Sequence, residues 1–186
     1  MELITQRLLL RQWQDKDLPE LARLNADPLV MKFYPNTLST QKSNAIAEKL
    51  KALISDRGWG FWAVETLDDN IFIGFVGLHE PVYELPVNPC IEIGWRLARE
   101  HWGNGYATEA ASASIKFGFE KLDLSEIYSF TSVANIKSRK VMERLKMTDQ
   151  KMNFKHPMIP EGSPLREHVL YKLNRDNWME NYKTIA

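Results

Sequence analysis

The chain has 186 residues, in which 24 Lys and Arg balance 24 Asp and Glu. This length suits a single domain, residues 1–186, that buries a sizeable core without disulfides or a metal. The balanced charge gives no field that would draw nucleic acid or a membrane surface, so neither is expected as a partner. One cysteine, Cys90, cannot form an intramolecular disulfide, and the N-terminus lacks the pattern of a signal peptide. We therefore expect a cytoplasmic protein.

The first third of the chain predicts one strand and two helices. Over residues 3–13, Leu8 and Leu10 alternate with Arg7 and Arg11, which predicts a strand with one charged side. Asp15 or Asp17 is placed to cap a helix with Pro19 in its first turn. Thr40 is placed to cap a longer helix that Gly58 ends.

A hairpin and a loop follow. Residues 59–65 and 71–78 are mostly apolar and are joined by a short turn, so they predict an antiparallel pair. Residues 79–89 hold three prolines and predict a loop, where substrate contacts tend to lie.

Residues 91–122 carry the strongest local signal. Ile91, Ile93, Trp95 and Leu97 alternate with polar residues as in a half-buried strand, and helical spacing begins after the two loop glycines. Glycines between a strand and a helix let backbone N–H groups approach an anion at the positive end of the helix dipole. The stretch therefore predicts a phosphate cradle.

The remainder completes a mixed α/β pattern. Residues 127–133 predict a strand parallel to the one at 91–97, because a helix connects them. A helix is predicted over 135–147, and two last strands over 148–154 and 167–173.

The ordered set of motifs resembles the GNAT acyltransferase superfamily. The residues that carry this resemblance are Trp102-Gly103-Asn104-Gly105-Tyr106-Ala107-Thr108-Glu109-Ala110 and Asn135-Ile136-Lys137-Ser138. A further set resembles the branch of Rim-type ribosomal-protein N-terminal acetyltransferases: Ile4-Thr5-Gln6-Arg7-Leu8-Leu9-Leu10-Arg11, Asp27-Pro28 and Ile73-Gly74-Phe75-Val76-Gly77.

This resemblance implies a fold and a donor. The fold would be α/β, a twisted mixed sheet of about six to seven strands with helices on both faces and a splayed gap between strands four and five. Acetyl-CoA would lie in that gap as co-substrate, with its pantetheine arm on the backbone of Trp95, Arg96 and Leu97. Its pyrophosphate would bind backbone N–H groups of Trp102, Gly103, Asn104, Gly105, Tyr106, Ala107 and Thr108. Asn135 and Ser138 would contact the far side of the arm, and Glu100 replaces the Gln or Arg of the family pattern.

The resemblance also implies catalytic roles. Glu92 matches a glutamate that serves as base in some relatives, or it orients the amine, or it is an exposed residue of an alternating strand. Many relatives place a tyrosine as general acid where this chain has Met142, so Ser138 is the substitute we name. As a helix serine, Ser138 could equally be a packed small residue.

The acceptor is expected to be a primary amine, either a protein N-terminus or a small molecule. Phe33, Tyr34, Glu80 and Glu84 form a candidate acceptor pocket, in which acids attract a cationic amine and rings pack on it. They could equally be ordinary loop and helix-end residues.

Further expectations concern metal binding, the oligomeric state and alternative classes of function. The histidines show no metal-ligand spacing, so no metal is expected. The protein is expected to be a monomer or a homodimer. A non-catalytic acyl-CoA-binding module remains the alternative function. A dinucleotide-binding enzyme is disfavoured because Thr108 occupies the third glycine position of that fingerprint.

Overall fold

The structure is a computed structural model that describes residues 1–183. It divides into two compact units, Met1–Leu78 with Gly94–Ser114, and His79–Ile93 with the residues from Ile115 onward. Strand β5 (Glu92–Leu97) begins in the second unit and ends in the first, and helix α3 (Tyr106–Lys121) begins in the first and ends in the second. No helix in this described part is long and apolar enough to cross a membrane.

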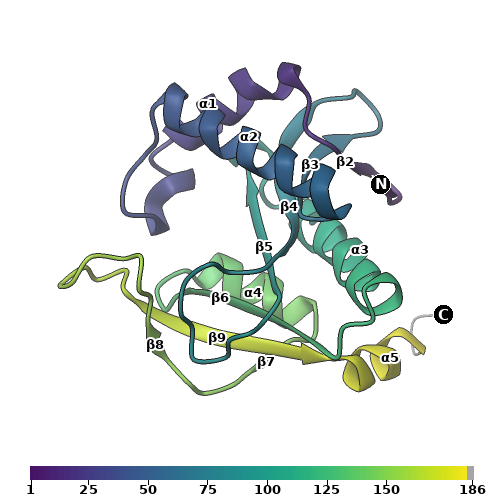
Figure 1. Cartoon of the computed structure of the whole chain (residues 1–186), viewed down its shortest axis with the longest axis vertical. Coiled ribbons are helices and arrows are strands. Elements are labelled where there is room, and N and C mark those ends of the chain that lie inside the picture. Colours follow the sequence, from purple (N-terminus) through teal and green to yellow (C-terminus); the bar gives the residue numbers. More distant parts are fainter. Residues whose placement is uncertain (184–186) are drawn as a thin grey trace. The chain divides into compact units, whose positions relative to one another are not determined.

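The first unit is an antiparallel sheet with two helices. Its remaining elements are β1 (Leu3–Ile4), β2 (Leu8–Arg11), η1 (Asp15–Asp17), α1 (Leu18–Ala26), η2 (Val30–Phe33), α2 (Thr40–Arg57), β3 (Phe61–Thr66), β4 (Phe72–His79) and η3 (Arg99–His101). Strands β1 to β4 pair in chain order, each antiparallel to the next. Figure 1 shows α1 and α2 side by side in this unit.

The second unit is a sheet built around β9. Its elements are β6 (Glu126–Ser132), α4 (Ile136–Arg144), β7 (Thr148–Asp149), β8 (Phe154–Lys155), β9 (Glu167–Asn174) and α5 (Arg175–Lys183). Strand β9 pairs antiparallel with β6, β7 and β8, while β6 pairs in parallel with β5 through Glu92 and Tyr128. The mixed α/β class, the hairpin at β3 and β4, and the parallel β5–α3–β6 connection are confirmed.

The strand count is a correction: the described residues form nine strands, not six to seven. The single strand predicted over 3–13 is two short strands, because a turn at Thr5 separates them and its N–H donates to the Leu8 carbonyl. The strand predicted over 148–154 is likewise two, β7 and β8. The sequence pattern also missed helix α5. Because the first predicted strand corresponds to both β1 and β2, the fourth and fifth predicted strands correspond to β5 and β6.

Two helix caps differ in detail from the prediction. Ser39, not Thr40, caps α2, because its hydroxyl accepts from the Lys42 N–H, while Gly58 ends the helix in the left-handed region as predicted. Asp17 precedes α1 as predicted, but its carboxylate accepts from the guanidinium of Arg11 instead of capping that helix.

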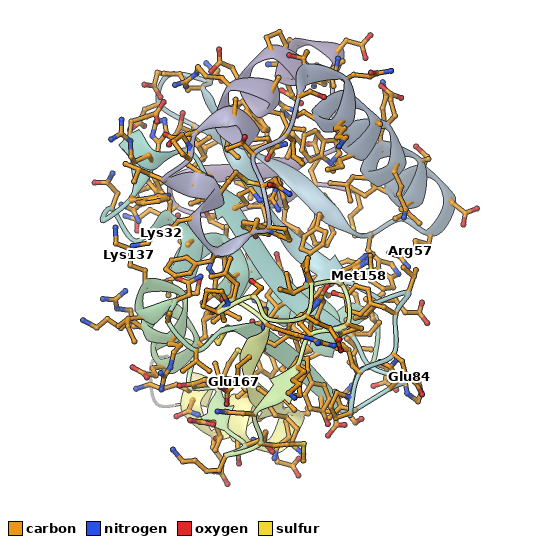
Figure 2. All side chains as sticks on the ribbon, turned by 90° about the vertical axis from the view of Figure 1, so that its left-hand side faces the viewer. Lys32, Arg57, Glu84, Lys137, Met158 and Glu167 are labelled. Carbon is orange, nitrogen blue, oxygen red and sulfur yellow. The ribbon has the colours of Figure 1, made fainter. Side chains whose placement is uncertain are left out.

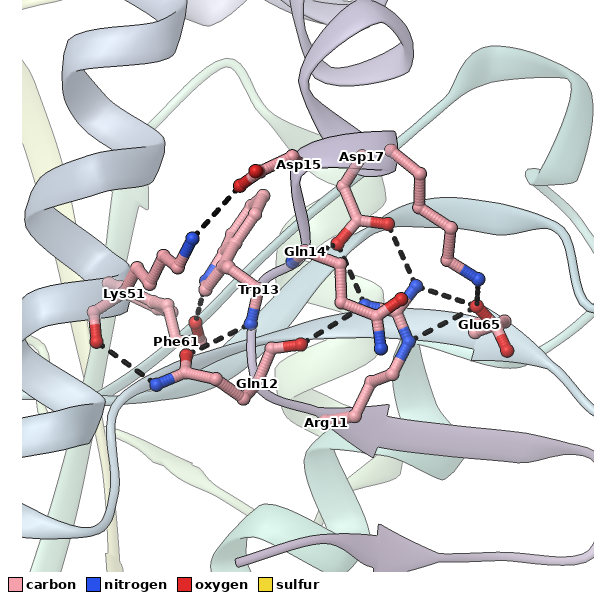
Figure 3. A network of polar contacts seen from close by, with 10 residues as sticks. Arg11, Gln12, Trp13, Gln14, Asp15, Asp17, Lys51, Phe61 and Glu65 are labelled. Atoms are coloured by element: carbon pink, nitrogen blue, oxygen red, sulfur yellow. Dashed lines mark hydrogen bonds and ion pairs between the residues drawn. The ribbon is translucent and has the colours of Figure 1, made fainter.

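A buried ion network is a second correction. Arg11, predicted on a charged side of its strand, is buried in the first unit and donates to both Asp17 and Glu65 (Figure 3). Lys16 also binds Glu65, at 2.9 Å. Burial raises the pKa of Glu65, but hydrogen bonds from Arg11 and Lys16 outweigh it and hold that pKa below its usual value. The network ties β2, the start of α1 and β3 together.

We predict that Asp17→Asn lowers the free energy of unfolding by about 3 kcal/mol, because removing one partner leaves the Arg11 charge buried and partly unpaired. Urea denaturation followed by circular dichroism measures this change. Lys51→Met, which removes the exposed ion pair with Asp15, is the control and should leave stability unchanged. A stability loss in the Asp17 variant no larger than in this control would contradict the account.

Candidate functional site

The donor-binding strand predicted from sequence is the second half of β5, in the first unit. Its neighbour β4 approaches closely at Gly74, where an added Cβ would overlap the Arg96 carbonyl oxygen. The side chain of Arg96 is held in place, since it donates to Asn25 Oδ1 at 2.7 Å and lies 4.0 Å from the ring centre of Tyr34. These contacts attach the second half of β5 to β4, to Asn25 of α1 and to Tyr34 after η2.

The loop of residues 102–105 and the start of α3 form an anion cradle. Gly103 and Gly105 have φ of 83° and 81°, a region that favours glycine, and an added Cβ at Gly103 would meet open space. The first helical bond of α3 runs from the Glu109 N–H to the Gly105 carbonyl at 3.0 Å. The N–H groups of residues 106–108 precede that bond and lack an intrahelical acceptor. Binding of a pyrophosphate by residues 102–108 stays a prediction.

Glu109 holds this cradle in position. Its carboxylate accepts from the Thr5 hydroxyl at 2.7 Å, from the Arg7 N–H at 2.9 Å and from Arg7 Nε at 2.7 Å. The Arg7 guanidinium also lies 4.6 Å from the ring centre of Tyr106, the first residue of α3. Burial raises the pKa of Glu109, but these hydrogen bonds outweigh it and keep that pKa below its usual value.

Thr5, Arg7 and Glu109 belong to the motifs that resemble the family, but the sequence predicts no individual role for them. Two features of the sequence could have indicated this contact. The short polar run of residues 5–7 lacked a predicted partner, and so did Glu109, an acidic residue in the first turn of α3.

Glu100, the departure from the family pattern, is neutralised. Its carboxylate accepts from Arg23 Nη2 of α1 at 2.6 Å. A backbone hydrogen bond and the bond from Arg23 lower the pKa of Glu100. Its negative charge is thereby paired with a cation beside the cradle.

Glu92 begins β5 in the second unit. Glu92 is half-buried, and no hydrogen bond or ion pair reaches its carboxylate from the side chains described over residues 1–181. Burial raises the pKa of Glu92 to about 8. A carboxyl group without a compensating partner and with a raised pKa is typical of a catalytic acid or base.

Asn135 and Ser138 lie together at the start of α4. Asn135 caps the helix, since its Oδ1 accepts from the Ser138 N–H at 3.3 Å. Its Nδ2 donates to Ser138 Oγ at 3.1 Å and to Thr131 Oγ1 at 2.9 Å. Because the Ser138 oxygen accepts from Asn135, its own proton is free to be donated elsewhere. Met142, where relatives place a tyrosine, is a buried core residue.

The ladder between β5 and β6 is interrupted within the second unit. Glu92 lies opposite Tyr128, but the Ile93 carbonyl accepts from the Ser129 hydroxyl at 2.9 Å. A side chain that bonds a strand carbonyl competes with the backbone ladder. The splayed gap beyond this point stays a prediction.

The four predicted acceptor residues are placed in separate units. Phe33 and Tyr34 lie at the end of η2 in the first unit, where Tyr34 packs on Arg96. Glu80 and Glu84 are exposed on the loop after β4 in the second unit. Each pair is described within its own unit, and the grouping of the four residues in one acceptor pocket stays a prediction.

Nucleophilic catalysis by Cys90 and binding of a metal ion are the two other kinds of chemistry to consider. Burial, with the nearby charges of Glu92, Glu126 and Glu80, raises the pKa of Cys90 to about 11, so its thiol is a poor nucleophile. Across residues 1–183, no three His, Cys, Asp or Glu side chains are grouped so that they could hold a metal ion.

Comparisons with known proteins concern the family and the fold of the chain. Residues 7–148 match the Acetyltransferase (GNAT) domain. The chain is 28% identical over 179 residues to YnaD, an uncharacterized N-acetyltransferase of Bacillus subtilis (strain 168), covering 96% of this chain and 99% of YnaD.

Solved structures show the same fold. An acetyltransferase (GNAT family) from Bacillus anthracis has a TM-score of 0.79 and 26% identity, and the match covers 95% of this chain and 99% of that one. RimL, a ribosomal L7/L12 alpha-N-protein acetyltransferase in complex with coenzyme A, has a TM-score of 0.74 at 18% identity, over 95% of this chain and 99% of that one. This second likeness concerns the fold.

We predict that Glu109→Gln lowers the free energy of unfolding by about 1 to 3 kcal/mol, because one oxygen that faces Arg7 becomes a donor. It should also weaken coenzyme A binding several-fold, since the start of α3 loses its anchor. Urea denaturation and isothermal titration calorimetry measure the two effects. Glu120→Gln, exposed on the same helix, is the matched control. An unchanged affinity in a destabilised Glu109 variant would contradict the role of this anchor.

Proposed function

Because this chain belongs to the GNAT acetyltransferase family, we propose that it transfers acetyl from acetyl-CoA to a primary amine, with Glu92 as the base. The observation that carries this proposal is the Glu92 carboxyl, which has a pKa raised to about 8 and no partner among the side chains described over residues 1–181. A base with a pKa near the working pH combines basicity with a sufficient ionised fraction.

The donor site follows from the family. Acetyl-CoA supplies an activated thioester, and the chain's own task is to bind and orient it. The backbone of Trp95, Arg96 and Leu97 would pair with the pantetheine arm, as an added strand does. The amides of residues 102–108 would hold the pyrophosphate, which is supported by the left-handed glycines and the unpaired start of α3.

The proton steps are assigned to two side chains. The Glu92 carboxylate takes the proton that the amine loses as it attacks, directly or through a water molecule. The Ser138 hydroxyl donates a hydrogen bond toward the leaving sulfur, an orientation that Asn135 favours by donating to Ser138 Oγ. A backbone N–H near Trp95 would stabilise the developing oxyanion.

The acceptor is either a protein N-terminal amine or a small-molecule amine. RimL, which shares the fold, is named for the first kind of acceptor. An N-terminal amine has a pKa near about 8, so a modest base is enough to deprotonate it. Phe33, Tyr34, Glu80 and Glu84 remain proposed acceptor contacts. We also propose a cytoplasmic location and a monomer or homodimer.

We predict that Glu92→Gln lowers kcat by about 100-fold or more, because general base catalysis typically contributes that much. The wild-type kcat/KM should rise with pH through about 8, where Glu92 ionises. In the Glu92→Gln variant, kcat/KM should rise with pH only as the acceptor amine itself loses its proton. Release of free coenzyme A thiol from acetyl-CoA and an amine panel gives both quantities.

Two further variants sharpen this experiment. Glu120→Gln, exposed on α3, should behave as the wild type. Ser138→Ala should lower kcat less than Glu92→Gln does, since a hydroxyl contributes a hydrogen bond and not a full proton transfer. A Glu92→Gln enzyme with wild-type kcat and pH profile would remove Glu92 from the base role.

A further inference from the structure

One face of the second unit gathers aromatic and histidine rings. Side chains alternate along a strand, so Tyr128 and Phe130 of β6 share a face. The register places Phe130 opposite Leu170 of β9, and Phe154 of β8 opposite His168, on that same face. We call Tyr83, Phe130, Phe154, His156 and His168 the aromatic face.

These rings contact one another closely. The ring centre of Phe130 lies 5.8 Å from that of Phe154 and 5.7 Å from that of His156. Tyr83, from the loop after β4, lies 4.9 Å from His156, and His156 lies 4.7 Å from His168. The aromatic face is therefore a continuous packed wall rather than a set of scattered rings.

Glu92 points to this same face. It is in parallel register with Tyr128, so the two side chains lie on one side of the sheet. Phe130 is the next residue of β6 on that side, and is thus the diagonal neighbour of Glu92. The proposed base and the aromatic face adjoin within the second unit.

The histidines of this wall are uncharged. His156 Nδ1 accepts from the Met158 N–H at 3.2 Å, so that nitrogen carries no proton. His168 Nδ1 lies 3.2 Å from the Arg166 carbonyl oxygen, to which it can donate as a neutral ring. Burial, together with the neighbouring His168, lowers the pKa of His156 to about 4. Burial also lowers the pKa of His168, so both histidine rings of the wall are favoured in the neutral form.

Part of the wall reaches the surface beside other apolar side chains. Phe130 and Tyr83 are only partly buried. Val82, next to Tyr83, is 80% exposed, and Met158, next to the His156 loop, is 65% exposed. Figure 2 labels Met158 on the loop after β8 and Glu84 on the loop after β4. Glu80 and Glu84 add negative charge on the loop that carries Tyr83, which is complementary to an approaching ammonium group.

We propose that the aromatic face binds the acceptor, and that this acceptor is a primary amine with an aromatic or branched apolar group a few bonds from its nitrogen. This proposal rests on the proposed role of Glu92, which receives the amine while Phe130 and Tyr83 contact the apolar group. A polyamine fits less well, because its unbranched chain buries less apolar surface against Phe130 and Tyr83 than a ring or a branched group does.

The test compares three amines, phenethylamine, isoamylamine and putrescine, by release of free coenzyme A thiol. We expect kcat/KM for phenethylamine to exceed that for putrescine by about ten-fold or more. Tyr83→Ala and Phe130→Leu should each lower kcat/KM for phenethylamine about five-fold and leave putrescine unchanged. Trp178→Ala, which removes a partly buried ring packed on Phe119, is the matched control and should change neither value.

Calorimetric binding of phenethylamine to the protein with coenzyme A present separates the two proposals. Binding that Tyr83→Ala weakens, without turnover of any amine, would support the aromatic face and contradict the transfer function. Turnover in which putrescine equals phenethylamine, or in which both variants slow all amines equally, would overturn the aromatic face and leave the function intact. Neither binding nor turnover of phenethylamine would also overturn it.

Discussion

The attachment of α3 to the turn between β1 and β2 is the interaction on which the proposed donor site depends. Glu109 accepts from Thr5 and Arg7 and so fixes the first turn of the helix. A carboxylate in that turn is also favoured by the helix dipole, and Arg7 balances its charge. The amides before this turn thereby stay directed at one point. A phosphate group can be bound there by backbone alone, which is why pairing Glu100 with Arg23 is compatible with the site.

The carboxyl of Glu92 is the opposite case, because nothing described compensates its charge. Burial raises its pKa, so the neutral form is favoured in the folded protein. Its contribution to stability is therefore greatest at acid pH and is lost as pH rises through about 8. An ion pair such as that of Arg11 with Asp17 would remove this cost, but it would also remove the basicity. The chain thus uses carboxylates in two ways, paired for structure and unpaired for the proposed chemistry.

The sequence predicted most of the fold because its signals were local. The glycines at 103 and 105 and the alternation over β5 each specify a backbone conformation within a few residues. The split of the first strand was missed because the alternation of Leu8 and Leu10 with charged residues hid the turn at Thr5, and the contact of Thr5 with Glu109 was missed because the two are far apart in sequence. Burial of Arg11 was missed for the same reason, since its partner Glu65 lies on another strand. The aromatic face arises from register between β6, β8 and β9, which no single segment encodes. Candidate residues were found by resemblance, whereas their charges and partners required the structure.

The central claim is that Glu92 is a proton acceptor whose pKa lies in the working range of the enzyme. The most direct measurement is an NMR titration of the Glu92 side-chain carboxyl carbon, assigned by comparison with Glu92→Gln. A midpoint of about 8 is expected. A midpoint near 4.5, the ordinary value for a glutamate, would contradict it, because Glu92 would then be fully ionised at neutral pH and too weak a base.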